Sequence, residues 1–284
     1  MNEKPIVDVQ NLWYRYERQD WALRGVDLRI FPGEFVAIIG QNGAGKTTLV
    51  KHFNRVLSPE KGRVIIDGRD THEIPFEEMA MRVGYCYQNP DHQIFNLTVK
   101  DELEFGLRLR KLPEVEINQR VQQVLEIVNL KEFEHEYPFS LSRGQRQKLA
   151  VGTILAMNPP LMIIDEPTTG MDWKGSEMMM QLIRDLHHTG RTIVMITHDM
   201  RIVAAYASRV IVMVNGKIIA DGTPKEIFVQ KEILATAFLE APQITRIAQA
   251  LESYGIPPDI LTIEEAVEVF TRKINEVKSN VSTI

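Results

Sequence analysis

Apolar and polar residues follow two patterns along the chain, and together these patterns predict a layered α/β fold. Residues 26–30 alternate apolar and polar side chains, as in an antiparallel strand with one buried face. Residues 35–39 are instead continuously apolar, which is typical of a strand covered on both faces. Further continuous apolar runs occupy residues 161–164, 192–196 and 210–214.

Segments with helical periodicity lie between the apolar runs, among them residues 114–128 and 176–188. Buried strands that alternate with helices form mostly parallel sheets. Asn215 and Gly216 join residues 210–214 to residues 217–220, a pattern that predicts a hairpin with a tight turn. The fold class we expect is α/β, with a mostly parallel sheet and an antiparallel β subdomain.

Two parts of the chain depart from this alternation. Residues 76–157 are largely helical and contain one short strand candidate at 83–87, so we expect a helical subdomain (about residues 88–158) inserted between the strands. From Pro242 onward the pattern changes to two amphipathic helical segments. The predicted organisation is therefore a core domain, residues 1–241, followed by a C-terminal helical extension, residues 242–284.

Each segment of the extension carries an apolar stripe, and a Gly-Ile-Pro-Pro break at residues 255–258 separates the two segments. The stripes consist of Ile244, Ile247, Ala248 and Leu251 in the first segment, and Ile263, Val267, Phe270, Ile274 and Val277 in the second. Such stripes require cover. The sequence leaves open whether the rest of the chain or a partner subunit supplies it.

Composition narrows the classes of function. The 33 Lys and Arg residues against 38 Asp and Glu residues give a net charge of −5, which argues against nucleic-acid binding by bulk charge. The single cysteine, Cys86, cannot form an intramolecular disulfide, which fits a reducing compartment. The N-terminus shows no signal-peptide pattern, and no uncharged apolar run approaches the roughly 18 residues that span a bilayer. We expect a soluble chain whose membrane role, if it has one, depends on a partner.

The strongest chemical motif is GQNGAGKTT at residues 40–48, between an apolar strand and a helix that reaches about Asn54. We call it the phosphate-binding loop. Glycines allow backbone N–H groups to converge on phosphate oxygens, and the helix N-terminus favours anions. Lys46 supplies a charge for the β- and γ-phosphates, and the Thr47 hydroxyl can bind Mg²⁺. The alternative, a purely structural glycine-rich turn, does not explain the lysine and threonine that follow.

Two other apolar strands end in groups that can act on a bound nucleotide. Residues 161–164 lead into Asp165 and Glu166, and residues 192–196 lead into Thr197 and His198. Ligands of open α/β sheets bind beyond the carboxyl ends of the strands. Asp165 therefore suits a metal site, and Glu166 suits a base that activates water. His198 can contact the γ-phosphate or the water. The other six histidines show no metal-ligand spacing, so we interpret them as structural or solvated.

Two further motifs are weaker alone. Ser142 is a good N-cap for a helical stretch at 145–156, and Gly144 permits close backbone approach, so this turn suits a phosphate. A helix with an N-cap of purely structural role would show the same sequence pattern. Gln88 follows the short strand candidate and precedes a loop and a helix.

The order of these motifs resembles that of ATP-binding cassette (ABC) ATPases over about residues 7–228. The phosphate-binding loop corresponds to Walker A, LSRGQ (the signature turn, residues 141–145) to the signature, and residues 169–172 to the D-loop. Gln88 corresponds to the Q-loop residue, and Asp165 with Glu166 to Walker B. In that family two cassettes face head to tail, so that each ATP lies between Walker A of one subunit and the signature of the other.

The resemblance implies ATP and Mg²⁺ as cofactors and ATP hydrolysis as the activity. Its catalytic residues would be Glu166, His198 and Gln88, and its metal site would use Thr47, Gln88 and Asp165. The nucleotide would contact Tyr16, which stacks on adenine, together with Gly40, Asn42, Gly43, Gly45, Lys46, Thr47, Thr48, Ser142, Gly144, Gln145 and Asp172. Arg143 departs from the usual signature, LSGGQ, because it replaces the first glycine.

Residues 87–106 narrow the resemblance to the ATPase subunits of energy-coupling factor (ECF) transporters and the related cobalt and nickel importers. In that family this stretch flanks a groove for coupling helices of a transmembrane subunit, and Asp91, Asp101 and Glu102 would make the groove acidic. A short C-terminal helical extension used in ATPase dimerisation also matches the striped tail.

The function this implies is ATP-powered uptake of a vitamin or metal-ion micronutrient, carried out peripherally at the cytoplasmic face of the cell membrane. The implied partners are a second ABC ATPase subunit, a transmembrane coupling subunit and a membrane substrate-binding subunit, and no nucleic acid. Two alternatives remain at this point: the ATPase of another ABC importer, and a soluble ABC protein that acts on nucleic acid or ribosomes.

Overall fold

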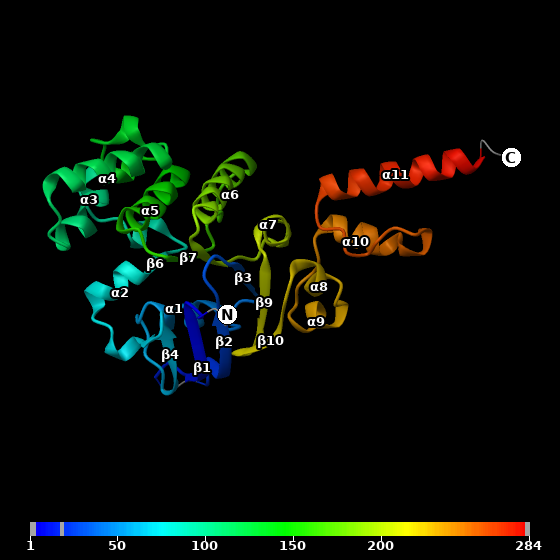
Figure 1. The fold of residues 1–284 in the computed structure, drawn as a ribbon, viewed down its shortest axis with the longest axis horizontal. Helices are drawn as coiled ribbons and strands as arrows, with labels where there is room; N and C mark the ends of the chain where they lie inside the picture. The colour runs from blue at the N-terminus through cyan, green and yellow to red at the C-terminus, as the bar shows by residue number, and fades with distance from the viewer. Residues whose placement is uncertain (1–3, 18–19, 282–284) are drawn as a thin grey trace.

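The computed structural model describes residues 4–17 and 20–281, in which the strands form two sheets surrounded by helices (Figure 1). The larger sheet has the order β10-β9-β3-β8-β7-β6. All neighbours pair in parallel except β10, which is antiparallel to β9. The predicted mostly parallel sheet is therefore confirmed. Its strands are β3 (Phe35–Ile39), β6 (Val83–Cys86), β7 (Leu161–Asp165), β8 (Thr192–Ile196), β9 (Arg209–Val214) and β10 (Lys217–Gly222).

The smaller sheet is antiparallel, as predicted from the alternating residues 26–30, and has the order β2-β1-β4-β5. Its strands are β1 (Val7–Tyr14), β2 (Leu23–Ile30), β4 (Lys61–Ile66) and β5 (Arg69–Asp70). Helix α1 (Lys46–Phe53) lies in the core that the two sheets share, where Leu49 and Phe53 are fully buried. Burying one such side chain stabilises the fold by about 1.5–3 kcal/mol, so this packing holds the start of α1 firmly in place.

Helices that contribute to one apolar core cover one face of the parallel sheet. They are α3 (Val99–Leu109), α4 (Glu114–Ile127), α5 (Arg143–Met157) and α6 (Trp173–His188). In Figure 1, α3, α4 and α5 form a lobe at the upper left, beyond β6. Helix α2 (Phe76–Arg82) leads directly into β6. The inserted helical region with its single short strand therefore lies beside the edge of the sheet that ends in β6.

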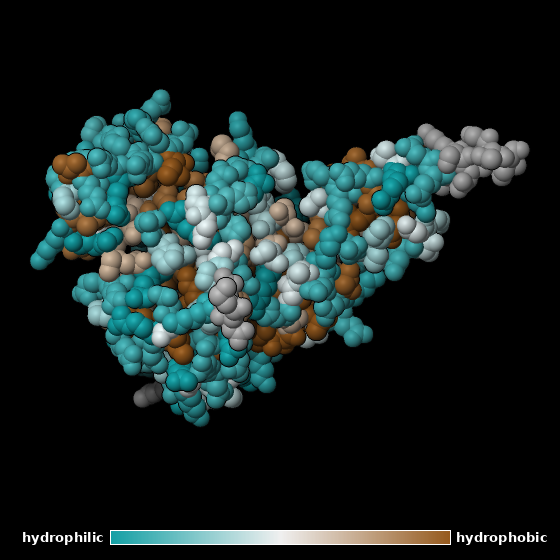
Figure 2. All heavy atoms as spheres, viewed as in Figure 1, coloured by the Kyte–Doolittle hydropathy of each residue, from teal (hydrophilic) through white to brown (hydrophobic). Residues whose placement is uncertain are grey.

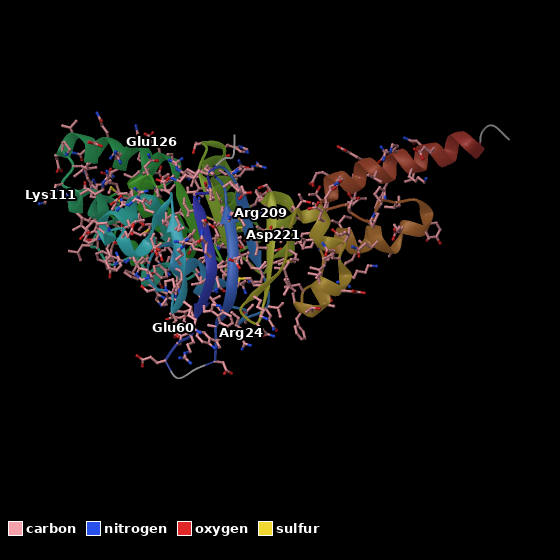
Figure 3. The ribbon with its side chains drawn as sticks, turned by 60° about the horizontal axis from the view of Figure 1, so that its bottom comes forward. Arg24, Glu60, Lys111, Glu126, Arg209 and Asp221 are labelled. Atoms are coloured by element: carbon pink, nitrogen blue, oxygen red, sulfur yellow. The ribbon has the colours of Figure 1, made fainter. Side chains whose placement is uncertain are left out.

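Shorter helices cover the other end of the sheet: α7 (Met200–Tyr206), α8 (Pro224–Phe228) and α9 (Lys231–Thr236). The predicted hairpin is β9–β10, and its turn residues, Asn215 and Gly216, both have positive φ angles, 48° and 76°. Figure 3 shows Arg209 and Asp221 side by side on these strands, where Arg209 Nη2 lies 2.7 Å from Asp221 Oδ2. This ion pair ties the outer strand of the hairpin to the sheet.

The chain ends in α10 (Gln243–Ala250) and α11 (Ile263–Val281), which project away from the sheets at the right of Figure 1. They share a small core of Ala248, Ile256, Ile260 and Ala266, and Thr245 Oγ1 donates a hydrogen bond to Ile260 O at 2.6 Å. Apolar residues remain visible along these helices in Figure 2. The exposed members of the predicted stripes are Ile247, Ile263, Val267 and Ile274. The side chain of Val277 lies outside the described residues.

Both helical segments predicted for the extension are thus present, but this chain leaves much of their apolar surface uncovered. Among the described residues, no helix combines the length and the apolarity that are needed to cross a bilayer.

Candidate functional site

Neighbouring strands of the parallel sheet bring the predicted site residues to one edge. The strands β3, β8 and β7 lie side by side. The phosphate-binding loop follows β3, His198 comes shortly after β8, and Asp165 ends β7 with Glu166 directly after it. Because parallel strands end at the same edge of a sheet, groups that are far apart in sequence meet there.

The phosphate-binding loop folds tightly because glycines occupy its positive-φ positions. Gly40, Gly43 and Gly45 have φ angles of 147°, 80° and 99°. A Cβ at Gly40 would lie 2.2 Å from Met213 O, and one at Gly45 would lie 2.7 Å from Ala22 O, so these positions exclude side chains. The loop ends at α1, whose first N–H groups are free to bind an anion.

Lys46 lies folded over this loop. Its Nζ donates hydrogen bonds to Gly40 O at 2.7 Å and to Gln41 O at 3.0 Å. Burial lowers the pKa of Lys46, and the carboxylates of Glu166 and Asp165 oppose this shift. A bound phosphate would add the negative charge that a buried ammonium group requires.

Asp165 accepts two hydrogen bonds at Oδ2, from Thr47 Oγ1 at 3.1 Å and from the buried Tyr85 hydroxyl at 2.9 Å. Burial raises the pKa of Asp165 against these two hydrogen bonds. A hydroxyl and a carboxylate oxygen at this spacing fit Mg²⁺, which prefers oxygen ligands and takes the rest from water and phosphate. The pairing with Tyr85 was not predicted, because Tyr85 reads in the sequence as an ordinary strand residue.

Glu166 adopts a left-handed backbone conformation, with φ of 50°. Its N–H donates to Ile196 O at 2.9 Å, which links β7 to β8 at the site. Its Oε2 lies 2.7 Å from His198 Nδ1 and accepts from Thr169 Oγ1 at 3.4 Å. A carboxylate held against an exposed imidazole in a strained turn is suited to orient a water molecule and receive its proton.

Tyr16 lies next to the same helix. Its hydroxyl is 3.3 Å from Thr48 Oγ1, and its ring meets the edge of Tyr14 with centroids 5.1 Å apart. Tyr14 in turn packs against His52, a buried residue whose pKa is lowered to about 4 by burial. These contacts hold a partly exposed aromatic ring beside the phosphate-binding loop, where a base can stack on it.

Two other residues predicted for the site, Gln88 and Asn42, have exposed side chains. Gln88 follows β6 with an exposed side chain, and the structure gives it no hydrogen bond to Asp165 or Glu166. Asn42 is exposed at the tip of the phosphate-binding loop. The structure therefore brings together Lys46, Thr47, Asp165, Glu166 and His198, while Gln88 forms no hydrogen bond to either carboxylate.

The signature turn lies at a second place. Ser142 caps α5, as predicted: its Oγ accepts from Gln145 N–H at 3.3 Å, and Gln145 Oε1 accepts from Ser142 N–H at 2.8 Å. Asp172 caps α6 by accepting from Gly175 N–H at 2.7 Å. These residues and Gly144 line one pocket of about 400 Å³. The residues predicted to contact nucleotide therefore form two groups at different positions on this chain: one at the phosphate-binding loop and one at the signature turn.

The expectation that three carboxylates around the start of α3 make a groove acidic was wrong for Glu102. Glu102 is buried, and it accepts hydrogen bonds from the N–H groups of Phe95 and Asn96 at 3.0 and 2.8 Å. Asp91 pairs with Arg146 at 2.8 Å. Glu102 therefore holds the loop before α3 in place, whereas Asp91 and Asp101 remain exposed, and Asp101 accepts a hydrogen bond from the Thr98 hydroxyl.

The same region also presents apolar side chains. Four of them are exposed between 40% and 78%, and we call them the apolar patch: Phe95, Leu97, Phe105 and Leu109. The rings of Phe95 and Phe105 meet edge to face, with centroids 4.8 Å apart. The sequence contains these residues within a helical pattern, but only the fold shows that they face outward.

Comparisons with known proteins agree with this geometry. The family model described as ABC transporter matches residues 23–169. The chain is 45% identical over 267 residues to a putative ABC transporter ATP-binding protein of Caldanaerobacter subterraneus, covering 94% of this chain and 46% of the relative. It spans less than half the length of that relative and of several others like it.

Two further matches extend over nearly the whole length of the other protein. The energy-coupling factor transporter ATP-binding protein EcfA of Methanocaldococcus jannaschii is 40% identical, over 87% of this chain and 89% of the relative. The solved structure of cbiO1 from Clostridium perfringens, described as part of the ABC transporter complex cbiONQ, superposes with a TM-score of 0.74. It is 35% identical and covers 88% of this chain and all of the other.

Proposed function

The chain belongs to the ABC transporter ATP-binding family, and on that premise we propose that it binds and hydrolyses ATP to power an ECF-type importer of a vitamin or metal ion. The observation that carries this proposal is the meeting of Lys46, Asp165, Glu166 and His198 at one edge of the sheet. The core domain, residues 1–241, would hold the nucleotide, and residues 242–284 would form the extension.

Each group has a distinct task in the proposed reaction. Lys46 exchanges its two carbonyl partners for phosphate oxygens, while the backbone of the phosphate-binding loop surrounds the rest of the triphosphate. Thr47 and Asp165 would hold Mg²⁺, which supplies charge neutralisation at the phosphates. Glu166 orients the attacking water and takes its proton, and His198 fixes the Glu166 carboxylate at 2.7 Å. Tyr16 stacks on the adenine, and Gln88 would reach the metal site as the loop after β6 moves.

A second cassette would complete each site. Ser142, Gly144, Gln145 and Asp172 are separate from the phosphate-binding loop of their own chain, which supports their use by a partner's nucleotide. Positioning and charge stabilisation account for most of phosphoryl-transfer catalysis, so a lone chain would hydrolyse ATP slowly. Closure around ATP and reopening after hydrolysis would then drive the transmembrane partner.

The apolar patch supports contact with such a partner at the cytoplasmic face of the membrane. Exposed apolar side chains that cluster around an aromatic pair are typical of interaction sites. A coupling helix of a transmembrane subunit could bury Leu97, which is 78% exposed, at the centre of its contact.

A co-purification experiment tests both parts of the proposal. The tagged chain is expressed in its native host, solubilised with membranes and analysed for bound subunits and for phosphate release from Mg-ATP. We expect the wild type to recover an ECF-type transmembrane subunit and a second cassette. Leu97→Asp should lose the transmembrane subunit but keep ATP binding. Val115→Asp is the matched control, because Val115 is 70% exposed on α4 and does not belong to the apolar patch.

Other outcomes identify the alternatives. Recovery of ribosomes or nucleic acid without a membrane subunit would favour a soluble ABC protein. Recovery of a membrane subunit from another importer class would keep the ATPase assignment and replace the ECF assignment. Absence of Mg-ATP binding would refute the proposal as a whole.

A further inference from the structure

The D-loop and the residue after it, Trp173, lie between two arginines from different helices. Arg143, the first residue of α5, lies directly against Gly170: a Cβ built on Gly170 would be 2.9 Å from Arg143 Cζ and 3.0 Å from its Nη1. Gly170 has a φ of 75°, so the turn needs glycine both for its conformation and for the space that the guanidinium fills.

The second arginine holds the other end of this segment. Arg201 Cζ lies 5.3 Å from the ring centroid of Trp173, the first residue of α6. Asp199 fixes Arg201 by accepting from its Nε at 3.1 Å and its Nη2 at 2.6 Å. Trp173 is 70% exposed, so burial in the core does not explain its position. Its ordered partner is the guanidinium.

These contacts and the proposed catalytic pair, Glu166 and His198, form one closed network. Thr169 donates from its N–H to Glu166 O and from Oγ1 to Glu166 Oε2. The same Oε2 lies against His198, and His198 is followed directly by Asp199, which holds Arg201. This closed network of contacts therefore runs from Glu166 through the D-loop to Trp173 and Arg201, and returns through Asp199 and His198. Arg143 connects this network to the signature turn.

We propose that Arg143 and Arg201 are positioning residues that make the D-loop a strap between the signature turn and the Glu166–His198 pair. The proposal rests on the function proposed above, in which the signature turn receives the nucleotide of a second cassette. A shift of α5 when that nucleotide binds would move Arg143, and through Gly170 and Thr169 it would move the Glu166 carboxylate. Because Arg143 stands where the usual signature has glycine, this link belongs to a side chain that the usual motif lacks.

Kinetics of hydrolysis by the intact complex give the main test. Arg143→Gly should lower kcat about 10- to 100-fold, where the upper value corresponds to a misplacement of about 1 Å, while KM for ATP stays within about 2-fold. Arg201→Ala should have a similar effect. The double variant should be less impaired than the product of the two single effects, because both residues act on one strap. Arg143→Lys should recover little, because an ammonium group lacks the flat face that covers Gly170.

Arg184→Ala is the matched control. Arg184 lies near the other end of α6 and packs on Tyr206 in the same manner, with Cζ 5.6 Å from the ring centroid, but none of the contacts that the structure describes joins it to the D-loop. The kcat of Arg184→Ala should equal that of the wild type. Equal or higher kcat in Arg143→Gly and Arg201→Ala, with active wild type, would overturn the proposal and leave the proposed function standing.

A spectroscopic readout keeps the test independent of turnover. The chain has three tryptophans, so Trp13→Phe and Trp21→Phe leave Trp173 as the reporter. In nucleotide-free protein, Arg201→Ala and Arg143→Gly should each shift Trp173 emission to the red and increase its quenching by acrylamide, whereas Arg184→Ala should not. If Trp173 is insensitive to both arginines, the strap does not exist, whether or not the protein hydrolyses ATP.

Discussion

The nucleotide site and the C-terminal helices both contain features that cost free energy, and the two kinds of feature are opposite. At the site the chain buries charge and strains its backbone: Lys46 and Asp165 have pKa values shifted toward their neutral forms, and Glu166 has a positive φ. Among the side chains of α10 and α11 that the structure describes, no charged one is buried, but apolar residues such as Val267 and Ile274 face solvent. Buried charge favours an ionic ligand, and exposed apolar surface favours a protein partner. The kind of imbalance therefore indicates the kind of molecule that relieves it.

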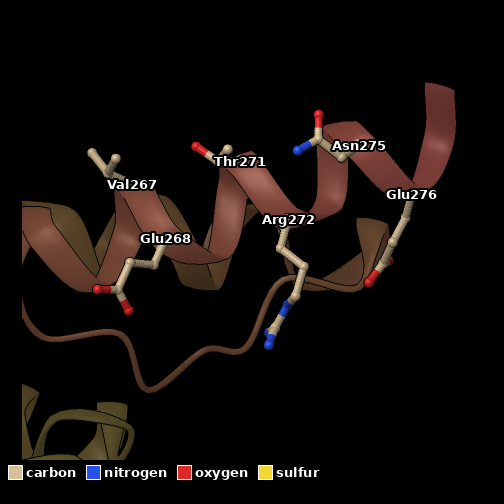
Figure 4. A pocket seen from close by; sticks show the side chains of 6 residues that line it. All are labelled: Val267, Glu268, Thr271, Arg272, Asn275 and Glu276. Atoms are coloured by element: carbon tan, nitrogen blue, oxygen red, sulfur yellow. The ribbon is translucent and has the colours of Figure 1, made fainter. Parts of the chain in front are cut away.

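Pocket size alone would point to the wrong region. An open hollow of about 750 Å³ lies along α11, lined by Val267, Glu268, Thr271, Arg272, Asn275 and Glu276. Figure 4 shows that these side chains come from a single helix, with Val267, Thr271 and Asn275 on one side and the charged residues on the other. Residues of the nucleotide site come instead from the start of α1, the end of β7 and the turns after β7 and β8, and they converge, which is what a reaction requires.

The largest expected effect is that of Glu166→Gln. Glutamine keeps the size of the side chain but cannot accept a proton from water, so kcat should fall about 10²- to 10⁴-fold while ATP binding survives. Phosphate release and nucleotide binding, measured on the same preparation, check both statements. Glu177→Gln on the exposed side of α6 is the control and should match the wild type. Unaltered turnover in Glu166→Gln would remove Glu166 from its proposed role.

Lys46→Ala should have the next largest effect, on affinity. Losing a charged hydrogen-bond donor to phosphate should weaken ATP binding about 10- to 100-fold, which corresponds to about 1.5–3 kcal/mol. Titration with a fluorescent ATP analogue measures this. Lys51→Ala, one turn further along α1, should bind normally. Equal affinities of these two variants would show that the loop does not hold the triphosphate.

The sequence predicted those parts of the fold and site that depend on local pattern. Residues 35–39, 161–164 and 192–196 have continuous apolar character, and the strands β3, β7 and β8 contain them. The N-cap role of Ser142 was predicted in the same way, and the structure adds its reciprocal partner Gln145 within the same turn. Contacts between distant segments were not predicted. Tyr85 meets Asp165 across 80 residues, and no local signal in a buried strand specifies that partner.

The surface was the least predictable part. Glu102 was expected to make a groove acidic, yet it is buried, where it accepts hydrogen bonds from the backbone N–H groups of Phe95 and Asn96. The stripe of α11 requires cover, and the sequence left its source open; in this chain Val267 is exposed. Periodicity shows that a helix has an apolar face but does not show what covers that face.

A smaller effect is expected for stability when Asp165 is replaced. Burial raises the pKa of Asp165, so the folded state holds the proton more tightly than the unfolded state. The stability associated with that proton is present below the unfolded pKa and is lost as pH rises through the folded pKa. At neutral pH, Asp165→Asn should therefore stabilise the nucleotide-free protein by about 0.5–2 kcal/mol while abolishing activity.

Urea titrations at several pH values measure this difference. The gain should shrink as the pH approaches the acidic range in which Asp165 itself is protonated. Asp185→Asn, on α6 away from the site, is the control and should show no comparable dependence on pH. If Asp165→Asn destabilises the protein at neutral pH, the hydrogen bonds from Thr47 and Tyr85 outweigh the burial of the charge.

The smallest effect concerns the exposed stripe. Val267 is 58% exposed, so Val267→Asp should change the stability of the purified chain by no more than about 0.5 kcal/mol. Its neighbour Ala266 is 2% exposed within the small core of the extension, and Ala266→Asp should disrupt α10 and α11 by burying an unpaired carboxylate. Thermal unfolding followed by circular dichroism separates the two cases. If Val267→Asp matched Ala266→Asp in the isolated chain, the stripe would already be covered, and its apolar surface would no longer indicate a missing partner.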